Sequence, residues 1–367
     1  MISNFLRGTK ACVLNQHVDI ARTLENLEEI DALTRRISER GPNRVYLVGC
    51  GDSYFTAVSG IYAMEKSSGL TTIAEEALEF ARYRIIDDKS LVVGISASGR
   101  TPRTLEACSN AREEGATIVG VTNEEKSPLT EIAHETILTR VEKPFGPPSS
   151  TSSTALAAIY ALAVYLGKNR NRIPQERFEK LEQQMRDLPE LVERTVYHPE
   201  NPSVTMQAAK DFSKSNDFHL VGGGPGYGAA LFGQVFMKEL SWVHSEAVEI
   251  EEFCHYQMMI LEKGETPVIM IAQPGRSRNR ALQILRELKN MGIPTYTVCE
   301  EGDTEISENS TYTVHIPKGL DEEFTTILYM QPLYFLALHL ASERKIDYEG
   351  FRYGETLSRL IHSPDML

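Results

Sequence analysis

The chain has 367 residues, of which 41% are hydrophobic and 24% are charged, and its formal net charge is −13 at pH 7. This composition is ordinary for a folded protein, and the length allows roughly two domains of about 150 residues each. Because nucleic-acid backbones attract basic surfaces, the acidic balance argues against nucleic acid as the main partner. It does not exclude a small phosphorylated metabolite.

The five cysteines are scattered along the chain, and no close cysteine or histidine pairs have the spacing of a zinc site. We therefore expect reduced cysteines, a cytoplasmic location and no metal centre. The first twenty residues lack the apolar core of a signal peptide, and no apolar run reaches the ~18–20 residues of a membrane span. Membrane binding is therefore not expected.

Taken in chain order, the first half alternates strand and helix patterns. The expected elements are a helix over 18–40, a strand over 44–49, helices over 54–67 and 75–83 on either side of a strand over 71–74, a strand over 91–95, a helix over 103–114, strands over 117–122 and 135–139, and a buried helix from 154 to 167. Alternating strands and helices predict a parallel sheet covered on both faces.

A hydroxyl-rich loop, Ser96-Ala97-Ser98-Gly99-Arg100-Thr101, follows the strand over 91–95 and precedes Pro102. Thr101 and Pro102 have the order of an N-cap residue and a first helical residue. Unpaired N–H groups at a helix start attract anions, and Gly99 allows the backbone to approach one closely. The loop is therefore a candidate phosphate site, with an ordinary well-capped turn as the alternative.

Two further segments are candidates for the same phosphate site. The Gly-rich turn with Gly51 and Ser53 also follows a strand, and ligands bind at the carboxyl ends of strands in open α/β sheets. The run from Ser149 to Thr154 precedes the apolar helix. It would either close the phosphate cradle or only cap that helix.

After a charged helical connector the same order of elements begins again. A strand over 218–222 ends in a Gly-rich turn and leads to a helix over 229–244; a strand over 268–273, a helix over 280–290 and a strand over 295–299 follow. This predicts one α/β domain duplicated. The expected division is an N-terminal segment 1–24, a first domain 25–167, a connector 168–203, a second domain 204–345 and a tail 346–367.

The helix over 229–244 contains a candidate acid or base. With helical spacing, Glu239 shares a face with Phe232, Phe236 and Val243. A carboxylate on an apolar face is costly unless it is paired or faces a polar cavity, and desolvation raises its pKa toward the range useful in proton transfer. The structural alternative is an ion pair at the edge of the core.

His255 lies downstream among several glutamates, and an imidazole can carry a proton near neutral pH. Its structural alternative is a solvated charged face. The segment from Gly224 to Ala229 also fits a loose G-x-G-x-x-A dinucleotide pattern, with Glu246 and Glu249 at the distance of a ribose ligand. A dinucleotide-binding oxidoreductase is therefore one alternative function.

From about residue 25 to residue 345, the chain resembles tandem SIS (sugar isomerase) domain proteins. The similarity rests on the Ser-x-Ser-Gly-x-Thr loop, on Gly226-Tyr227-Gly228-Ala229-Ala230, on the run from Lys238 to His244, and on Glu-Phe-x-His ending at His255. It is similar to the isomerase half of glucosamine-6-phosphate synthase, and more so to deglycases of fructosamine-type 6-phosphates. The resemblance implies two doubly wound, flavodoxin-like parallel-sheet domains in tandem.

The resemblance also implies roles for individual residues. It assigns catalysis to Glu239 and His255, which lie 16 positions apart. It assigns phosphate or sugar binding to Ser53, Ser96, Ala97, Ser98, Thr101 and Ser150, with further contacts from Gly51 and Arg100. It implies a homodimer in which the histidine completes the site of the neighbouring subunit.

Four departures from the family pattern qualify the similarity. No glutaminase domain precedes the first repeat, and the segment from Arg359 to Leu367 has no counterpart of the synthase's imine-forming lysine. Tyr256-Gln257 replaces the usual Gly-Pro after the histidine. Arg100 replaces an acidic or neutral residue, and would add a phosphate contact or bind a carboxylate on the substrate.

We therefore expect an enzyme that acts at C1–C2 of an amino-linked hexose 6-phosphate. Glu239 would move a proton between C1 and C2, and His255 would assist ring opening or protonate the leaving amine, with no metal or redox cofactor. The departures favour a deglycase over a glucosamine-6-phosphate deaminase or a synthase-like isomerase. A phosphosugar-binding regulator is the non-enzymatic alternative, but it would not need Glu239 and His255.

Overall fold

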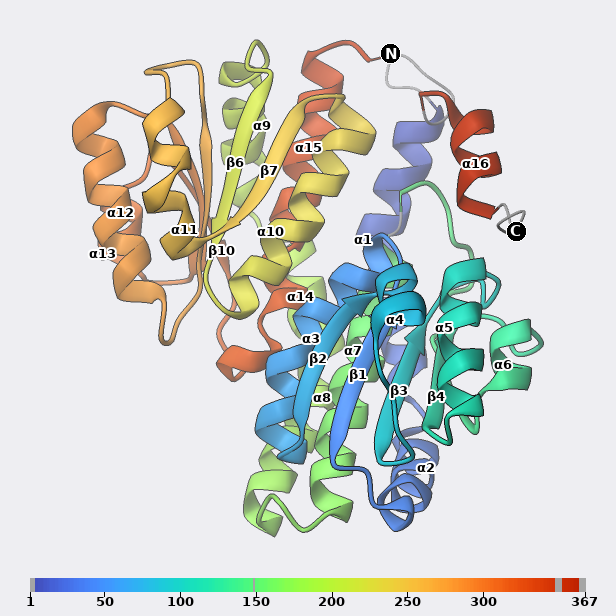
Figure 1. Cartoon of the computed structure of the whole chain (residues 1–367). Coiled ribbons are helices and arrows are strands. Elements are labelled where there is room, and N and C mark those ends of the chain that lie inside the picture. The colour runs from blue at the N-terminus through green and yellow to red at the C-terminus, as the bar shows by residue number, and fades with distance from the viewer. Residues whose placement is uncertain (1–3, 148, 347–351, 363–367) are drawn as a thin grey trace. The chain divides into compact units, whose positions relative to one another are not determined.

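The computed structural model describes residues 4–147, 149–346 and 352–362 and divides into two compact units. The first unit comprises residues 15–144, 148–189 and 352–367, and the second comprises residues 1–14, 145–147 and 190–351. Each unit contains a five-stranded parallel sheet flanked by helices (Figure 1). This confirms the predicted fold class of two doubly wound α/β domains in tandem. Residues 1–3 of the expected N-terminal segment, and residues 347–351 and 363–367 of the expected tail, lie outside the described residues.

The first sheet has the strand order β2-β1-β3-β4-β5. Its strands are β1 (Arg44–Gly49), β2 (Thr71–Glu76), β3 (Ser90–Ile95), β4 (Thr117–Thr122) and β5 (Glu135–Leu138). The helices are α2 (Leu27–Arg40), α3 (Asp52–Ser68), α4 (Ala77–Tyr83), α5 (Pro102–Glu113), α6 (Pro128–Ile132), α7 (Ser150–Asn169) and α16 (Gly354–His362), and α1 (Asn4–Leu24) and α8 (Gln175–Val196) contribute residues to both units.

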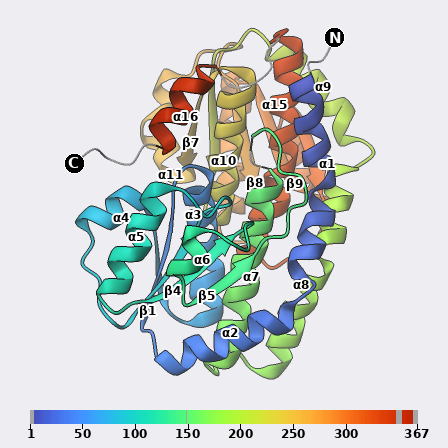
Figure 2. The same cartoon turned by 90° about the vertical axis from the view of Figure 1, so that its right-hand side faces the viewer.

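Alternating side chains of the strands pack against helices on opposite faces of this sheet. Tyr46 and Val48 point to α4 and α5, where they pack with Phe80 and Cys108. Leu47 points to the other face, where Gly60 lets α3 lie close to both the sheet and α7. Figure 2 shows these helices in a second view. The strands therefore read as nearly continuous apolar runs because both faces are covered.

Helix α7 is long and apolar enough by composition to cross a membrane, yet 94% of its most apolar window is buried inside the structure. Its residues from Ser152 to Gly167 are buried, and it packs against α2 and α3. Its burial is that of a core helix, as the apolar run predicted.

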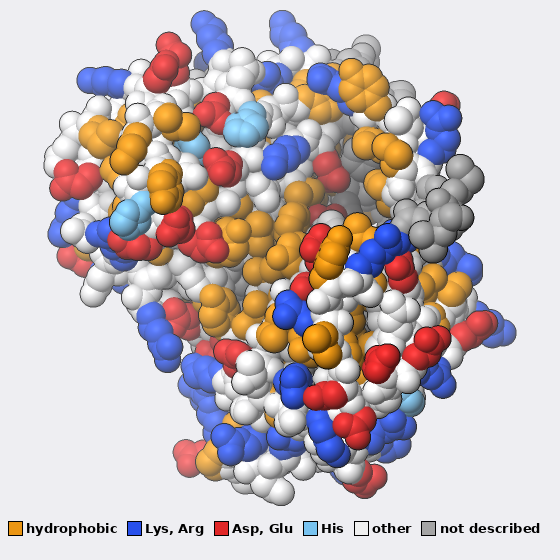
Figure 3. Space-filling model, viewed as in Figure 1, with side chains coloured by type: hydrophobic (Ala, Val, Ile, Leu, Met, Phe, Trp, Pro, Cys, Tyr) orange, Lys and Arg blue, Asp and Glu red, His pale blue; other side chains and the backbone are white. Residues whose placement is uncertain are grey.

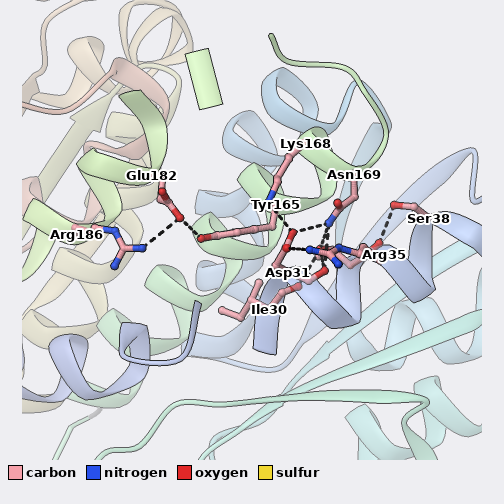
Figure 4. Close-up of polar contacts among 10 residues, drawn as sticks. Ile30, Asp31, Arg35, Ser38, Tyr165, Lys168, Asn169, Glu182 and Arg186 are labelled. Carbon is pink, nitrogen blue, oxygen red and sulfur yellow. Dashed lines mark hydrogen bonds and ion pairs between the residues drawn. The ribbon is translucent and has the colours of Figure 1, made fainter. Parts of the chain in front are cut away.

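A buried carboxylate joins α2 to α7 (Figure 4). Asp31 is 8% exposed and accepts hydrogen bonds from Lys168 Nζ at 3.1 Å and Asn169 Nδ2 at 3.0 Å, and it also pairs with Arg35. Burial alone would raise the pKa of Asp31, but the hydrogen bonds from Asn169, Lys168 and Arg35 outweigh it and lower the pKa. The charged form of Asp31 is therefore part of the folded structure.

The second sheet has the order β10-β9-β8-β6-β7, which read backwards matches the first. Its strands are β6 (Asp217–Gly222), β7 (His244–Glu249), β8 (Val268–Ala272), β9 (Thr295–Glu300) and β10 (Tyr312–Ile316). The helices are α9 (Asn201–Asp211), α10 (Pro225–Phe236), the π-helix η1 (Met237–Ser241), α11 (Ile250–His255), η2 (Gln257–Ile260), α12 (Arg278–Met291), α13 (Thr304–Glu308), η3 (Glu322–Phe324), α14 (Thr326–Tyr329) and α15 (Gln331–Glu343).

Three local predictions were wrong. The helix expected over 18–40 is interrupted at residues 25–26, where α1 ends and α2 begins. The helix expected over 229–244 ends earlier, because the α-helix passes into η1 and His244 begins strand β7. The hydroxyl run expected before the apolar helix lies mostly inside it. Helix α7 begins at Ser150, and Thr154 Oγ1 bonds back to Ser150 O at 2.7 Å instead of serving a turn.

Replacing Asp31 by Asn should lower the free energy of unfolding at neutral pH by roughly 1.5–3 kcal/mol, the range for hydrogen bonds to charged groups. A lowered folded-state pKa stabilises the fold above the ordinary value of 3.8, and this contribution is lost as the pH falls through the folded pKa. The difference between wild type and Asp31→Asn should thus shrink in urea titrations below pH ~4. The exposed Asp187→Asn is the control, and a gap that stays constant at low pH would contradict the assignment.

Candidate functional site

The strand order places the predicted phosphate loop at the switch point of the first sheet. β1 and β3 are neighbours, with Val48 opposite Gly94, while β2 lies on the other side of β1. The connections that leave β1 and β3 therefore diverge and open a crevice at their carboxyl ends. The turn at Gly51, which leads to Ser53 at the start of α3, and the loop from Ser96 to Thr101 begin at these two ends.

Two of the predicted hydroxyls in the loop contact each other directly. Ser96 Oγ and Thr101 Oγ1 are 2.9 Å apart, and Ser96 is 1% exposed. Thr101 is the N-cap residue of α5 but makes no side-chain cap, so its hydroxyl is engaged with Ser96 instead. Ser98 is exposed, and its Oγ accepts a hydrogen bond from the N–H of Arg100 at 3.3 Å.

The path of the loop depends on Gly99. Its φ is +61°, and a Cβ at this position would lie 2.2 Å from Ser127 Oγ, so only glycine fits. Ala97 is exposed, and its carbonyl accepts the N–H of Asn123 at 2.9 Å. The loop is thereby tied to the end of β4.

Arg100 is exposed, and its Nη2 donates to the carbonyl of Lys126 at 3.4 Å. The guanidinium thus lies along the neighbouring 123–127 segment. Ser150 is buried at the first position of α7. Both residues belong to the first unit, and their contact with a phosphate stays a prediction.

The turn after β1 holds Gly51 with φ +56° in open space, followed by Asp52 and the half-buried Ser53. Sequence reasoning missed two acids here. Burial raises the pKa of Asp52 to about 7. Glu76 Oε1 accepts the thiol hydrogen of Cys50 at 3.3 Å. Burial and this neighbour raise the pKa of Cys50 to about 12, so Cys50 is a thiol and not a nucleophilic thiolate.

In the second unit, Glu239 lies in the middle of the π-helix η1. It is half-buried, and its neighbours Met237 and Leu240 are buried. The π-turn ends at Trp242, which has a left-handed backbone with φ +52°. π-turns and left-handed non-glycine residues are uncommon and are concentrated at functional sites, where surrounding contacts hold them.

Such contacts surround η1. Ser241 Oγ donates to Ala337 O at 2.8 Å, which ties the end of the π-turn to α15. Gln234 Oε1 accepts the N–H of Ala247 at 3.0 Å, which ties α10 to β7. Phe236 stacks on Tyr334 with ring centroids 3.8 Å apart. Glu239 is therefore held on a fixed frame.

His255 is the last residue of α11 and lies at the surface. Its side chain is 63% exposed, and its Nε2 is 3.8 Å from Glu251 Oε1. Arg280 also holds that carboxylate, at 2.8 and 2.9 Å. Glu239 and His255 thus lie on different elements of the second unit.

The turn after β6 also bears on the dinucleotide alternative. Gly224 is the N-cap of α10 with φ +56°, and Pro225 occupies the first turn. A Cβ on Gly226 would lie 3.0 Å from Gln273 Oε1. The side chain of Gln273 is fully buried and donates to Gly223 O at 2.9 Å, so protein atoms already pack against these glycines.

Known protein sequences agree with this arrangement. The SIS domain matches twice, over residues 40–165 and 211–342. A glutamine–fructose-6-phosphate aminotransferase (isomerizing) from Thermococcus kodakarensis is 32% identical over 321 residues, which is 86% of this chain and 52% of that protein. The Clostridium perfringens protein of the same name is 30% identical over 90% of this chain and 52% of its own length. The chain thus spans about half the length of these relatives.

Solved structures show the same fold. The C-terminal domain of glucosamine-fructose-6-phosphate aminotransferase from Francisella tularensis superposes with a TM-score of 0.83 at 20% identity, covering 95% of this chain and 98% of that one. A glucosamine-6-phosphate deaminase from Thermotoga maritima gives 0.67 at 22% identity, with 90% and 96% covered. The two matched segments, each built on the same five-stranded sheet, make this chain a member of the SIS-domain family with two SIS domains in tandem.

Proposed function

We propose that the protein is a sugar-phosphate enzyme that acts at C1–C2 of an amino-linked hexose 6-phosphate, and that it works as a deglycase. One observation carries the proposal. The chain combines a hydroxyl-rich loop at the switch point of its first sheet with a half-buried carboxylate on a fixed π-turn of its second unit. A binding module would need only the loop.

The first unit would hold the phosphate. Ser98 and Thr101 bring hydroxyl donors to the start of α5, a helix of 12 residues whose unpaired N–H groups attract an anion. Ser53, Ser96 and Ser150 are the other donors that we assign to this task, with the backbone of Gly51 and Ala97 and the guanidinium of Arg100. Binding energy at the phosphate would thereby orient the sugar's reacting carbons.

The second unit would move the proton. With a ketosamine, the Glu239 carboxylate would take a proton from C1, and the electron pair would form the C1–C2 double bond of an enolamine. The π pair of the C2 carbonyl would move to its oxygen, which would take up a proton from solvent and become a hydroxyl. The nitrogen would later give up its N–H proton as the C1 imine forms. The same carboxyl would return the proton at C2, which leaves a C1 imine. Water would then add at C1, and His255 would protonate the departing amine nitrogen. The products would be a free amine and an aldose 6-phosphate.

The exposure of His255 supports a homodimer in which this histidine completes the site of the other subunit. Beside it, Tyr256, Met259 and Ile260 are 65%, 80% and 60% exposed. Apolar side chains gathered at a surface mark an interaction site. Figure 3 shows hydrophobic and histidine side chains next to one another on the part of the second unit where α11 and α12 lie.

The second candidate function is an aldose–ketose isomerase of the kind found in the aminotransferase relatives. The 32% identity to the Thermococcus kodakarensis protein favours it. Both candidates use the same proton transfer and differ in whether an amine is released. Incubation with phosphorylated ketosamines and with fructose 6-phosphate distinguishes them, because only a deglycase releases amine.

Glu239→Gln should lower kcat at least ~100-fold, since a positioned acid or base contributes about 10²–10⁴ in rate. Affinity for the phosphosugar should stay nearly unchanged because the amide keeps the shape of the acid. The rate of amine release measures the loss in kcat, and calorimetry measures the affinity for the phosphosugar. The exposed Glu252→Gln should behave as wild type. Undiminished turnover of Glu239→Gln would end the acid–base assignment.

Ser98→Ala should weaken binding of the phosphorylated substrate by roughly 10- to 100-fold, as expected for a hydroxyl hydrogen bond to a charged group. Ser98 is exposed, and a melting curve checks that the variant keeps its fold. The unphosphorylated sugar should lose nothing, because it has no group for Ser98 to bind. Equal losses for the two sugars would show that Ser98 does not contact phosphate.

Glu239→Gln and His255→Ala should each be inactive alone, but mixed dimers from co-expression should regain roughly a quarter of wild-type activity for random pairing. One of the two sites in a mixed dimer then receives an intact glutamate and an intact histidine. If His255 serves its own subunit, the mixture will stay as inactive as its components.

A further inference from the structure

The second unit carries a loop at the same place as the candidate phosphate loop of the first. It runs from Gln273 to Ser277, between β8 and α12, and β8 neighbours β6 as β3 neighbours β1. Both loops end in the same order of residue types, Gly99-Arg100-Thr101 in the first and Gly275-Arg276-Ser277 in the second. Both glycines have positive φ, +61° and +114°. Helix α12 has 14 residues, so its start also offers unpaired N–H groups.

In the second unit a carboxylate of the chain itself occupies this loop. The N–H of Arg276 donates to Glu322 Oε1 at 3.0 Å. A Cβ on Gly275 would lie 2.3 Å from the carboxyl carbon of Glu322, so the carboxylate rests directly on the bare glycine backbone. The carboxylate of Glu322 thus occupies the position in which a loop before a helix start would bind a phosphate.

The polar side chains of Gln273 and Ser277 in this loop have hydrogen-bond partners within the protein. Gln273, fully buried, takes the place that Ser96 has in the first loop, and Thr325 Oγ1 donates to its Oε1 at 3.3 Å. Ser277 Oγ donates to Gly223 O at 3.4 Å. The second loop therefore keeps the backbone donor and the arginine of the first, but its hydroxyl and amide side chains have protein partners.

Glu322 reaches the loop from the connection that follows β10. In the first unit the corresponding connection follows β5 and leads to Ser149 and Ser150 at the start of α7. The same stretch of the two repeats thus supplies hydroxyls in one and a carboxylate in the other. Nearby Arg278 is already bound by Asp303 at 2.6 and 2.9 Å, which leaves Arg276 as the cation of the loop itself.

We propose that the second SIS repeat retains an anion-binding cradle built on Gly275, Arg276 and the start of α12, and that the carboxylate of Glu322 closes it. The intramolecular carboxylate has a large advantage in effective concentration over a free anion. Wild-type protein therefore binds no phosphate at this cradle, and removal of Glu322 opens it to inorganic phosphate or a phosphate ester.

The test counts phosphate sites per chain by equilibrium dialysis with radiolabelled inorganic phosphate. Glu322→Ala should bind one phosphate more per chain than wild type. Glu308→Ala removes the same charge from an exposed position of the same repeat and should gain none. The comparison is repeated in the Ser98→Ala background, where the first-repeat site is weakened.

The phosphate counts of these variants distinguish a failure of the second-repeat cradle from a failure of the proposed phosphate site in the first repeat. A wild type without any phosphate site, together with a Glu322→Ala variant with one, would overturn the first-repeat assignment and support the cradle. Equal counts in wild type and Glu322→Ala would overturn the cradle. Glu322→Gln keeps the shape of the closed loop, so it checks folding, and the amide N–H signal of Arg276 should shift with added phosphate only in Glu322→Ala.

Discussion

The crossover pattern of each sheet is the constraint on which the candidate site depends. After β1 the chain crosses to one side to form β2, and it then returns past β1 to form β3. Because the two connections leave in opposite directions, their first residues border an open crevice instead of covering it. The hydroxyls of Ser53 and Ser98 border this crevice because the two connections leave the sheet in opposite directions. The conformational preferences of the serines themselves do not place them there.

The duplicated fold uses this constraint differently in its two copies. In the first unit, Gly99 draws the loop against Ser127 and leaves Ser98 at the surface. In the second unit, Glu322 fills the corresponding loop. The feature that we assign to chemistry in the second unit is instead the π-helix η1 after α10. Ser241 of η1 is hydrogen-bonded to α15, and Gln234 of α10 is hydrogen-bonded to β7. The two units thus share the same sheet and crossover pattern, and differences in the connecting segments determine what each unit can bind.

Much of the fold could be predicted from the sequence because its strands are buried on both faces. The runs Leu91–Ile95 and Thr117–Thr122 are continuous apolar stretches, and no helix of ordinary length fits between their flanking turns. Ser96, Ser98 and Thr101 could be predicted as phosphate-binding candidates because the order of strand, hydroxyl-rich loop and helix is visible in a short stretch of sequence. The pairing of Glu239 with His255 rested on family resemblance, because nothing in the pattern relates two residues on separate elements.

The errors also have physical causes. Val243 continues the helical apolar spacing, so the sequence alone does not reveal that α10 passes into the π-helix η1 or that His244 begins an edge strand. Ser153 and Thr154 donate their hydroxyls to carbonyls one turn earlier, so they can lie inside α7 although such residues are expected at helix ends. Glu322 could not be recognised, because its partner Arg276 is 46 residues away.

The central proposal is that binding of the substrate's phosphate directs proton transfer at C1 of the sugar. The most direct measurement is the loss of deuterium from C1 of a fructosyl-amino-acid 6-phosphate labelled there, followed by NMR against the same labelled compound without its phosphate. The account predicts loss from C1 that is much faster for the phosphorylated compound, whether the deuterium then moves to C2 or to solvent. Equal loss from both compounds, or no loss from either, would contradict it.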